Sequence, residues 1–166
     1  MVMARRRSYE QGHRPKFLVF VDDTPECGRA VRFAARRVAR LGAKLVMLAV
    51  SAPPESFEWL GVGDVMRAEA EEEATEQLEK AAVLAREAAG VEPERVFRVG
   101  KKQDEILKLI EEDEDIAFLV LAAGTSSEGP GPLVTNFAGV AASTFPLPVV
   151  IVPGSLTDED IDALAG

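Results

Sequence analysis

Short apolar runs alternate with segments of helical periodicity along the whole chain, and this alternation limits the possible folds more than any other feature. Continuous apolar runs are typical of strands that are covered on both faces of a parallel sheet. The pattern predicts strands over residues 17–21, 44–50, 95–99, 117–123 and 149–152. Because parallel strands need crossover connections, we expect an α/β domain with a five-stranded parallel sheet and helices on both faces.

The segments between the runs carry apolar residues at the spacing of an α-helix. This spacing predicts helices near residues 25–41, 64–89, 103–112 and 133–144. Thr24 and Pro25 resemble an N-cap followed by a first-turn proline, and Gly42 is expected to end the first helix. Thr157 and Asp160 have the spacing of a capping box, which predicts a short helical tail near the C-terminus.

The length of 166 residues suits one domain, and the charge of the chain restricts its partners. Residues 1–15 have no hydrophobic period and are expected to form a flexible N-terminal arm, which leaves residues 16–166 as the folded domain. With 28 acidic against 19 basic residues, the net charge of −9 argues against nucleic acid or an anionic membrane as a partner. No apolar run could span a bilayer and no secretory signal is recognisable, so a cytoplasmic location is expected.

Two residue types that carry much of enzyme chemistry are almost missing. His13 is the only histidine and lies in the arm, which leaves none inside the fold for a catalytic triad or a zinc site. Cys27 is the only cysteine, so no intrachain disulfide can form. It falls in the first turn of a predicted helix, where the helix dipole can lower the pKa of a thiol, but we expect a buried, inert cysteine. We therefore do not expect an enzyme.

Two segments could bind a ligand where predicted strands end. Asp22 and Asp23 follow the first strand, where carboxylates can hold a ribose hydroxyl or a divalent cation, or can simply favour the start of a helix. Residues 124–132 are rich in glycine and hydroxyl groups and precede a predicted helix, so they form either an anion cradle or a structural turn. This segment is not a Walker loop. Two prolines remove amide donors from it, and Glu128 adds a charge that repels phosphate.

Several short patterns occur in a characteristic order. They are residues 19–22, residues 48–50, Gly100 with residues 105–107, Asp115 with residues 119–121, and residues 148–152. In this order they resemble the universal stress protein family over about residues 16–153. The resemblance implies a flavodoxin-like (HUP-type) three-layer sandwich with strand order 3-2-1-4-5, a homodimer and, in one branch of the family, a site for ATP or AMP with Mg²⁺.

The same resemblance implies positions for the nucleotide site. Carried over by position, they are Asp22 near the nucleoside, the backbone of Val50 near the adenine, and Ala123, Gly124, Thr135 and Asn136 around the phosphates. This sequence departs from the family's glycine signature, because the second glycine is displaced to Gly129 and Thr135 places a Cβ where the signature has a glycine. Asn136 fits the signature.

Two functions remain open. One is a stress-response dimer that uses an adenine nucleotide as a regulatory switch. The other is a dimeric interaction protein with a degenerate pocket, which contacts unknown protein partners through its acidic surface or the loop with Phe57 and Trp59. A phosphoacceptor receiver domain is excluded, because the third strand is not followed by an acceptor aspartate nor the fifth by a lysine.

The resemblance also implies where two copies would pair. The last predicted strand is apolar on both of its faces, and in the expected order it lies at an edge of the sheet. A self-complementary dimer interface is therefore expected on this strand. Its residues are Val149, Val150, Ile151 and Val152.

Overall fold

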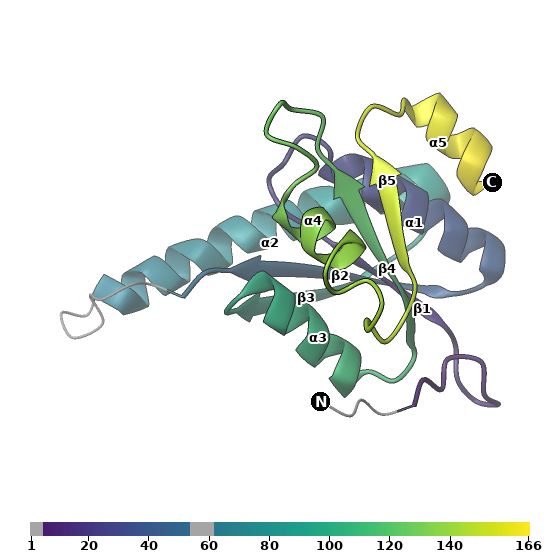
Figure 1. Ribbon diagram of the computed structural model, residues 1–166, viewed down its shortest axis with the longest axis horizontal. Coiled ribbons are helices and arrows are strands. Elements are labelled where there is room, and N and C mark those ends of the chain that lie inside the picture. Colours follow the sequence, from purple (N-terminus) through teal and green to yellow (C-terminus); the bar gives the residue numbers. More distant parts are fainter. Residues whose placement is uncertain (1–4, 54–61) are drawn as a thin grey trace.

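The computed structural model describes residues 5–53 and 62–166 (Figure 1). Strands and helices alternate along the chain as the apolar runs predict. In chain order the elements are β1 (Lys16–Phe20), α1 (Cys27–Leu41), β2 (Lys44–Ser51), α2 (Val62–Ala89), β3 (Glu94–Val99), α3 (Lys102–Glu112), β4 (Ile116–Ala123), α4 (Pro132–Ala138), β5 (Val149–Pro153) and α5 (Asp158–Ala165).

The sheet has five strands in the order β3-β2-β1-β4-β5, and all four pairings are parallel. Helices α1, α2 and α5 pack on one face of the sheet, and α3 and α4 pack on the other (Figure 1). The predicted fold class, a flavodoxin-like three-layer sandwich with order 3-2-1-4-5, is therefore confirmed. β3 and β5 are the two edge strands.

Successive side chains of each strand point to opposite faces of the sheet, and this alternation builds two hydrophobic cores. In β1, Phe17 and Val19 enter the core beneath α1, α2 and α5, whereas Leu18 and Phe20 enter the core beneath α3 and α4. Both sets are almost fully buried. This is why the strand reads as a continuous apolar run.

The start of α1 differs from the prediction. The helix begins at Cys27 with Glu26 at the N-cap, and no side chain caps it. Thr24 is not the cap, because its hydroxyl donates instead to Asp22 Oδ1 at 2.5 Å. Gly42 does end the helix, in the left-handed conformation and with its N–H bonded to the Val38 carbonyl.

Helix α4 is shorter than predicted, since it ends at Ala138 and turns occupy the rest of the expected span. The chain leaves the helical conformation at Gly139, where φ is −103° and ψ is −107°. An added Cβ there would lie 2.6 Å from the Thr135 carbonyl oxygen, so this conformation requires glycine. The predicted capping box is present at α5, where the Thr157 side chain accepts from the Asp160 N–H and the Asp160 carboxylate accepts from the Thr157 N–H.

Residues 5–15, predicted to be part of a flexible arm, lie at the end of the sheet where the strands begin. The Arg6 guanidinium donates to the carbonyls of Ile110 and Asp113 at 2.7 and 2.9 Å. His13 Nδ1 lies 2.6 Å from Asp115 Oδ1. The flexibility of this segment in solution stays a prediction.

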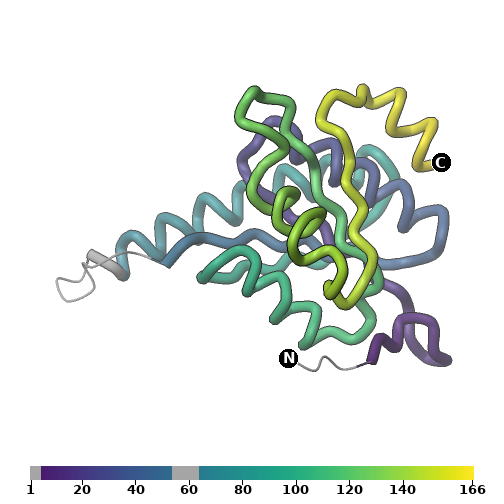
Figure 2. Tube along the Cα trace, viewed as in Figure 1, coloured from purple at the N-terminus to yellow at the C-terminus, as the bar shows by residue number. Residues whose placement is uncertain are grey.

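Of the two surfaces predicted for protein contacts, the structure describes only one. The loop with Phe57 and Trp59 lies outside the described residues. The acidic block is exposed on the part of α2 that extends away from the sheet, as the tube in Figure 2 shows. Its members are Glu69, Glu71, Glu72, Glu73 and Glu76. Within the described ranges, no helix is long and apolar enough to cross a membrane.

Candidate functional site

A cavity of about 720 Å³ opens where β1 and β4 end, and it is bordered by the starts of α1 and α3 and by α4. The strand order reverses at this point, since the chain proceeds from β1 to β2 and β3 on one side and returns to β4 and β5 on the other. Ligands of open parallel sheets bind at such a switch point. The volume is in the range of small-molecule sites.

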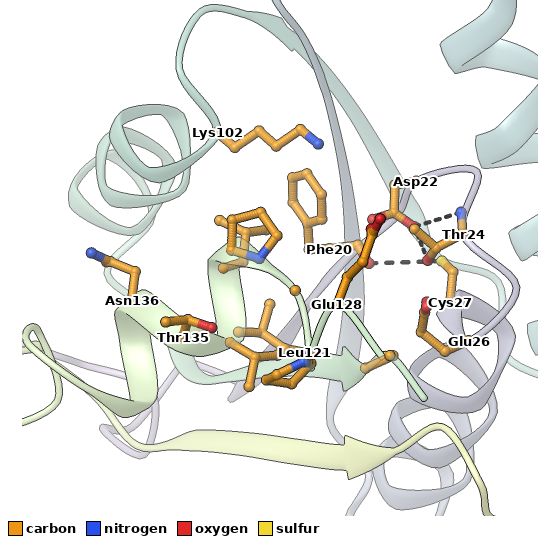
Figure 3. A pocket seen from close by; sticks show the side chains of 18 of the residues that line it. Phe20, Asp22, Thr24, Glu26, Cys27, Lys102, Leu121, Glu128, Thr135 and Asn136 are labelled. Carbon is orange, nitrogen blue, oxygen red and sulfur yellow. Dashed lines mark hydrogen bonds between the residues drawn. The ribbon is translucent and has the colours of Figure 1, made fainter. Parts of the chain in front are cut away.

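Asp22 lies in this cavity with one carboxylate oxygen already engaged. Its Oδ1 accepts hydrogen bonds from the Thr24 N–H at 3.0 Å and from the Thr24 hydroxyl at 2.5 Å (Figure 3). These two bonds hold the carboxylate in one orientation at the end of β1. The Oδ2 atom is not used by them and can accept a hydrogen bond from a ligand hydroxyl.

The glycine-rich loop that follows β4 is closed on itself. The Gly124 N–H donates to the Pro130 carbonyl at 2.9 Å, and the Gly129 N–H donates to the Ser126 carbonyl at 3.1 Å. The Glu128 N–H donates to the Ser126 hydroxyl at 3.3 Å. Pro130 has no N–H to offer. An anion cradle needs amide groups that point at the ligand, and this loop uses the amides of Gly124, Glu128 and Gly129 for its own hydrogen bonds.

Helix α4 adds little to anion binding. It has seven residues and begins with Pro132, which lacks an amide proton. Thr135 and Asn136 both line the cavity, as the resemblance implies, but the Thr135 N–H is bonded to the Gly131 carbonyl at 3.0 Å. In Figure 3 these two side chains lie on the opposite side of the view from Asp22.

Three carboxylates line the cavity, those of Asp22, Glu26 and Glu128 (Figure 3). Sequence reasoning did not select Glu26, because it reads as part of a helix start. The side chain of Glu26 packs beneath the glycine-rich loop, where its Oε1 lies 3.2 Å from the position that a Cβ on Gly124 would take. Its Oε2 is buried and accepts no hydrogen bond from the described residues.

Lys102 is the one cationic residue among the described residues that line the cavity. It is the first residue of α3, and its Nζ lies 5.8 Å from the centre of the Phe20 ring. That distance is within the range of a cation–π contact. No carboxylate pairs with this ammonium group in the part of the chain that the structure describes. The sequence did not indicate that Lys102 lines the cavity, because this residue follows β3, and β3 lies two strands away from β1 in the sheet.

Five of the predicted site residues are brought together in the cavity. They are Asp22, Gly124, Gly129, Thr135 and Asn136. Asp23, Val50 and Ala123 do not line it. Asp23 is exposed. The place of these three residues in a binding site therefore rests on the resemblance alone.

Cys27 lines the cavity but is not a nucleophile in the folded state. Burial raises the pKa of its thiol from 9.0 to about 12, and the nearby carboxylates of Asp22 and Glu26 act in the same direction. The thiol donates to the Phe20 carbonyl at 3.9 Å. A thiol with this pKa stays protonated at neutral pH.

The cavity does not provide a metal site of its own. Across residues 5–53 and 62–166, no group of three or more His, Cys, Asp or Glu side chains is placed to hold a metal ion. The three carboxylates therefore act as separate charges. A cation would have to arrive with a ligand.

The chain is thus an α/β protein with a flavodoxin-like sheet and a cavity at the switch point of that sheet. A family model described as universal stress protein family matches residues 13–153. The chain belongs to this family. The comparison with curated proteins gives no match.

Solved structures of low sequence identity share the fold. The universal stress protein UspA from Lactobacillus plantarum is 16% identical with a TM-score of 0.69, over 83% of this chain and 97% of that one. A universal stress protein from Archaeoglobus fulgidus in complex with dAMP is 22% identical with a TM-score of 0.58, over 83% and 97%. A family protein from Arabidopsis thaliana with AMP bound is 22% identical with a TM-score of 0.57, over 87% and 94%.

Proposed function

We propose that this protein binds an adenine nucleotide in the cavity at the ends of β1 and β4 and uses it as a regulatory switch in a stress response. The observation that carries the proposal is the carboxylate of Asp22 at the switch point, whose Oδ1 accepts two hydrogen bonds from Thr24 and whose Oδ2 takes part in neither. Two proteins of the same fold were solved with dAMP and with AMP.

The residues around Asp22 suit the parts of such a ligand. Phe20, Leu121 and Val134 give the cavity an apolar wall for a base. Asp22 Oδ2 can accept from a ribose hydroxyl, which is the usual role of an acidic residue beside a nucleoside. Mg²⁺ would enter as the counter-ion of the phosphates, because the described residues offer it no site.

The proposed role is binding rather than catalysis. The described residues that line the cavity include no histidine, and their one cysteine is held protonated by burial. Among the described residues, neither a histidine base nor a thiolate nucleophile is therefore placed at the ligand. Any hydrolysis of ATP would be slow.

Calorimetric titration with AMP tests the proposal. We expect a dissociation constant in the micromolar range, on the order of −8 kcal/mol or weaker. Asp22→Ala should weaken binding about tenfold through the lost ribose hydrogen bond. Gly124→Val should also weaken it, because a side chain there meets Glu26 Oε1 and the Gly129 carbonyl. Asp23→Ala is the control, since Asp23 is exposed and outside the cavity. Unchanged affinity in both cavity variants would place the ligand elsewhere.

The alternative is a dimeric interaction protein that leaves the cavity unused. It is favoured by the internal hydrogen bonds of the glycine-rich loop, which occupy the amides of Gly124 and Gly129. A wild-type protein that binds no adenine compound but remains a dimer in light scattering would support this alternative.

A further inference from the structure

We propose that the cavity selects an adenine nucleoside or a nucleotide with at most one phosphate, and that Glu26 and Glu128 exclude polyphosphates. The inference rests on the proposed adenine-nucleotide function and specifies the ligand class for the same cavity. It assigns Glu26, Glu128 and Lys102 as residues that determine specificity.

The first argument is the supply of hydrogen-bond donors. A polyphosphate chain presents acceptor oxygens only, so each phosphate needs several donors from the protein. In the glycine-rich loop the N–H groups of Gly124, Glu128 and Gly129 are already bonded to other atoms of the loop. Pro130 and Pro132 contribute none. These three N–H groups therefore become available to a polyphosphate only if the loop first breaks its own hydrogen bonds.

The second argument is the balance of charge. Asp22, Glu26 and Glu128 carry three negative charges along the cavity, against the single positive charge of Lys102. Repulsion between carboxylates and phosphates grows with each phosphate that is added to the ligand, and the walls of a cavity strengthen it. AMP gains one cationic partner, but ATP brings further charges for which the cavity has no cation.

Glu26 is the strongest of these determinants because of its position. Its Oε1 lies 3.2 Å from the place that a Cβ on Gly124 would take, at the start of the loop that would have to hold the phosphates. The buried Oε2 has no donor among the described residues. A buried acceptor without a partner is costly, and a ligand hydroxyl or amino group would relieve that cost, whereas a phosphate oxygen would increase it.

Lys102 determines how much negative charge the ligand can carry. Its ammonium lies over the Phe20 ring and faces the cavity without a carboxylate partner (Figure 3). One ammonium supplies a single positive charge, which offsets most of the charge of one phosphate group, about −1.5 to −2 at pH 7. The residue is therefore expected to distinguish AMP from adenosine, since only AMP has a group for it to bind.

Calorimetric titrations of the full chain with adenosine, AMP and ATP, each with and without Mg²⁺, test the inference. We expect AMP to bind most tightly and ATP at least about tenfold more weakly than AMP. Glu26→Gln and Glu128→Gln should each strengthen ATP binding, so that the AMP-to-ATP ratio of association constants falls severalfold. Lys102→Gln should weaken AMP about tenfold and leave adenosine almost unchanged.

Glu87→Gln is the matched control, because Glu87 is an exposed glutamate of α2 outside the cavity. Circular dichroism checks that each variant folds, and Glu128→Gln, on an exposed loop, keeps the test valid if Glu26→Gln unfolds. ATP binding by the wild type as tight as AMP binding would overturn the inference and leave the proposed function standing. Failure of all three ligands to bind would overturn both. An AMP-to-ATP ratio that neither glutamine variant changes would overturn the role of the carboxylates.

Discussion

The hydrogen bonds between Asp22 and Thr24 determine whether Thr24 caps helix α1 or orients a carboxylate in the cavity. Threonine is a common residue type at the N-cap of a helix. The hydroxyl of an N-cap threonine accepts a hydrogen bond from a backbone N–H of the helix that follows it. Here its hydroxyl and its N–H both donate backwards to Asp22. Helix α1 consequently starts without a side-chain cap, and the stability that such a cap would contribute, about 1 kcal/mol, is forgone. What the chain obtains instead is a carboxylate of defined orientation in the cavity.

The buried thiol of Cys27 gives a prediction at the residue scale. Because burial raises its pKa to about 12, the reactive thiolate is nearly absent from the folded protein at pH 8. The native protein should react with iodoacetamide or an aromatic disulfide reagent far more slowly than the protein unfolded in urea does. Fast labelling of the native protein, followed by intact mass, would show that the thiol is accessible and that the cavity wall is misplaced.

At the scale of elements, the glycine-rich loop shows what a sequence cannot reveal. Its glycines and hydroxyl groups predict a cradle and a turn equally well. The two outcomes differ only in where the N–H groups point. Their direction depends on the hydrogen bond of 2.9 Å from the Gly124 N–H to the Pro130 carbonyl oxygen. The same holds for Glu26 and Lys102, which come to the cavity from α1 and α3 through the strand order rather than through a local motif.

The elements themselves were largely predictable, for a physical reason. Buried parallel strands must be apolar on both faces, so β1 and β4 are visible as runs. The role of Gly42 as a helix terminator was predictable because the left-handed backbone conformation at the end of a helix favours glycine. The length of helix α4 was overestimated because the helix ends in a non-helical conformation at Gly139, which the periodicity of the apolar residues does not record.

Helix α5 gives a prediction about acid stability. The Arg32 guanidinium binds Asp162 with two hydrogen bonds of 2.7 Å, and these lower the pKa of the Asp162 carboxyl below its ordinary value of 3.8. A lowered pKa stabilises the fold in full above that ordinary value, and the contribution is lost as the pH falls through the lowered pKa. The free energy of unfolding should therefore fall less between pH 7 and pH 3 in Asp162→Asn than in the wild type.

Urea unfolding at the two pH values measures this difference, and Glu111→Gln, an exposed carboxylate of α3, is the control. Ile161→Ala tests the packing of the same helix independently of pH. Ile161 is fully buried, so its truncation should cost about 2–4 kcal/mol. A change below about 0.5 kcal/mol would mean that α5 does not pack as described.

At the scale of the whole molecule, strand β5 leads to the proposed homodimer. β5 pairs only with β4, so its other edge has no strand partner within the described chain. Val149, Val150 and Ile151 are half-buried rather than buried, and Pro148 and Pro153 keep the edge short. An apolar edge of this kind is a hazard unless another chain covers it. A second copy paired across a two-fold axis would do so.

We predict that light scattering after size exclusion gives twice the chain mass of 17.9 kDa. Ile151→Lys should raise the dimer dissociation constant by about a hundredfold or more, because it places an unpaired charge in a desolvated contact. Leu164→Lys on α5 is the control, since Leu164 is 66% exposed. A wild-type protein that is monomeric at high micromolar concentration contradicts the dimer, and an intact dimer of the folded Ile151→Lys variant moves the interface elsewhere.

The central claim is that an adenine nucleotide occupies the cavity at the ends of β1 and β4, and an NMR titration of the isotope-labelled protein with AMP tests it most directly. The account predicts that the largest changes in amide chemical shift fall on Asp22, Lys102, Gly124 and Gly129, which all line the cavity. Glu87 and Ile161 should be unaffected. An AMP titration that changes no amide of the cavity, or that changes only amides elsewhere on the molecule, would contradict it.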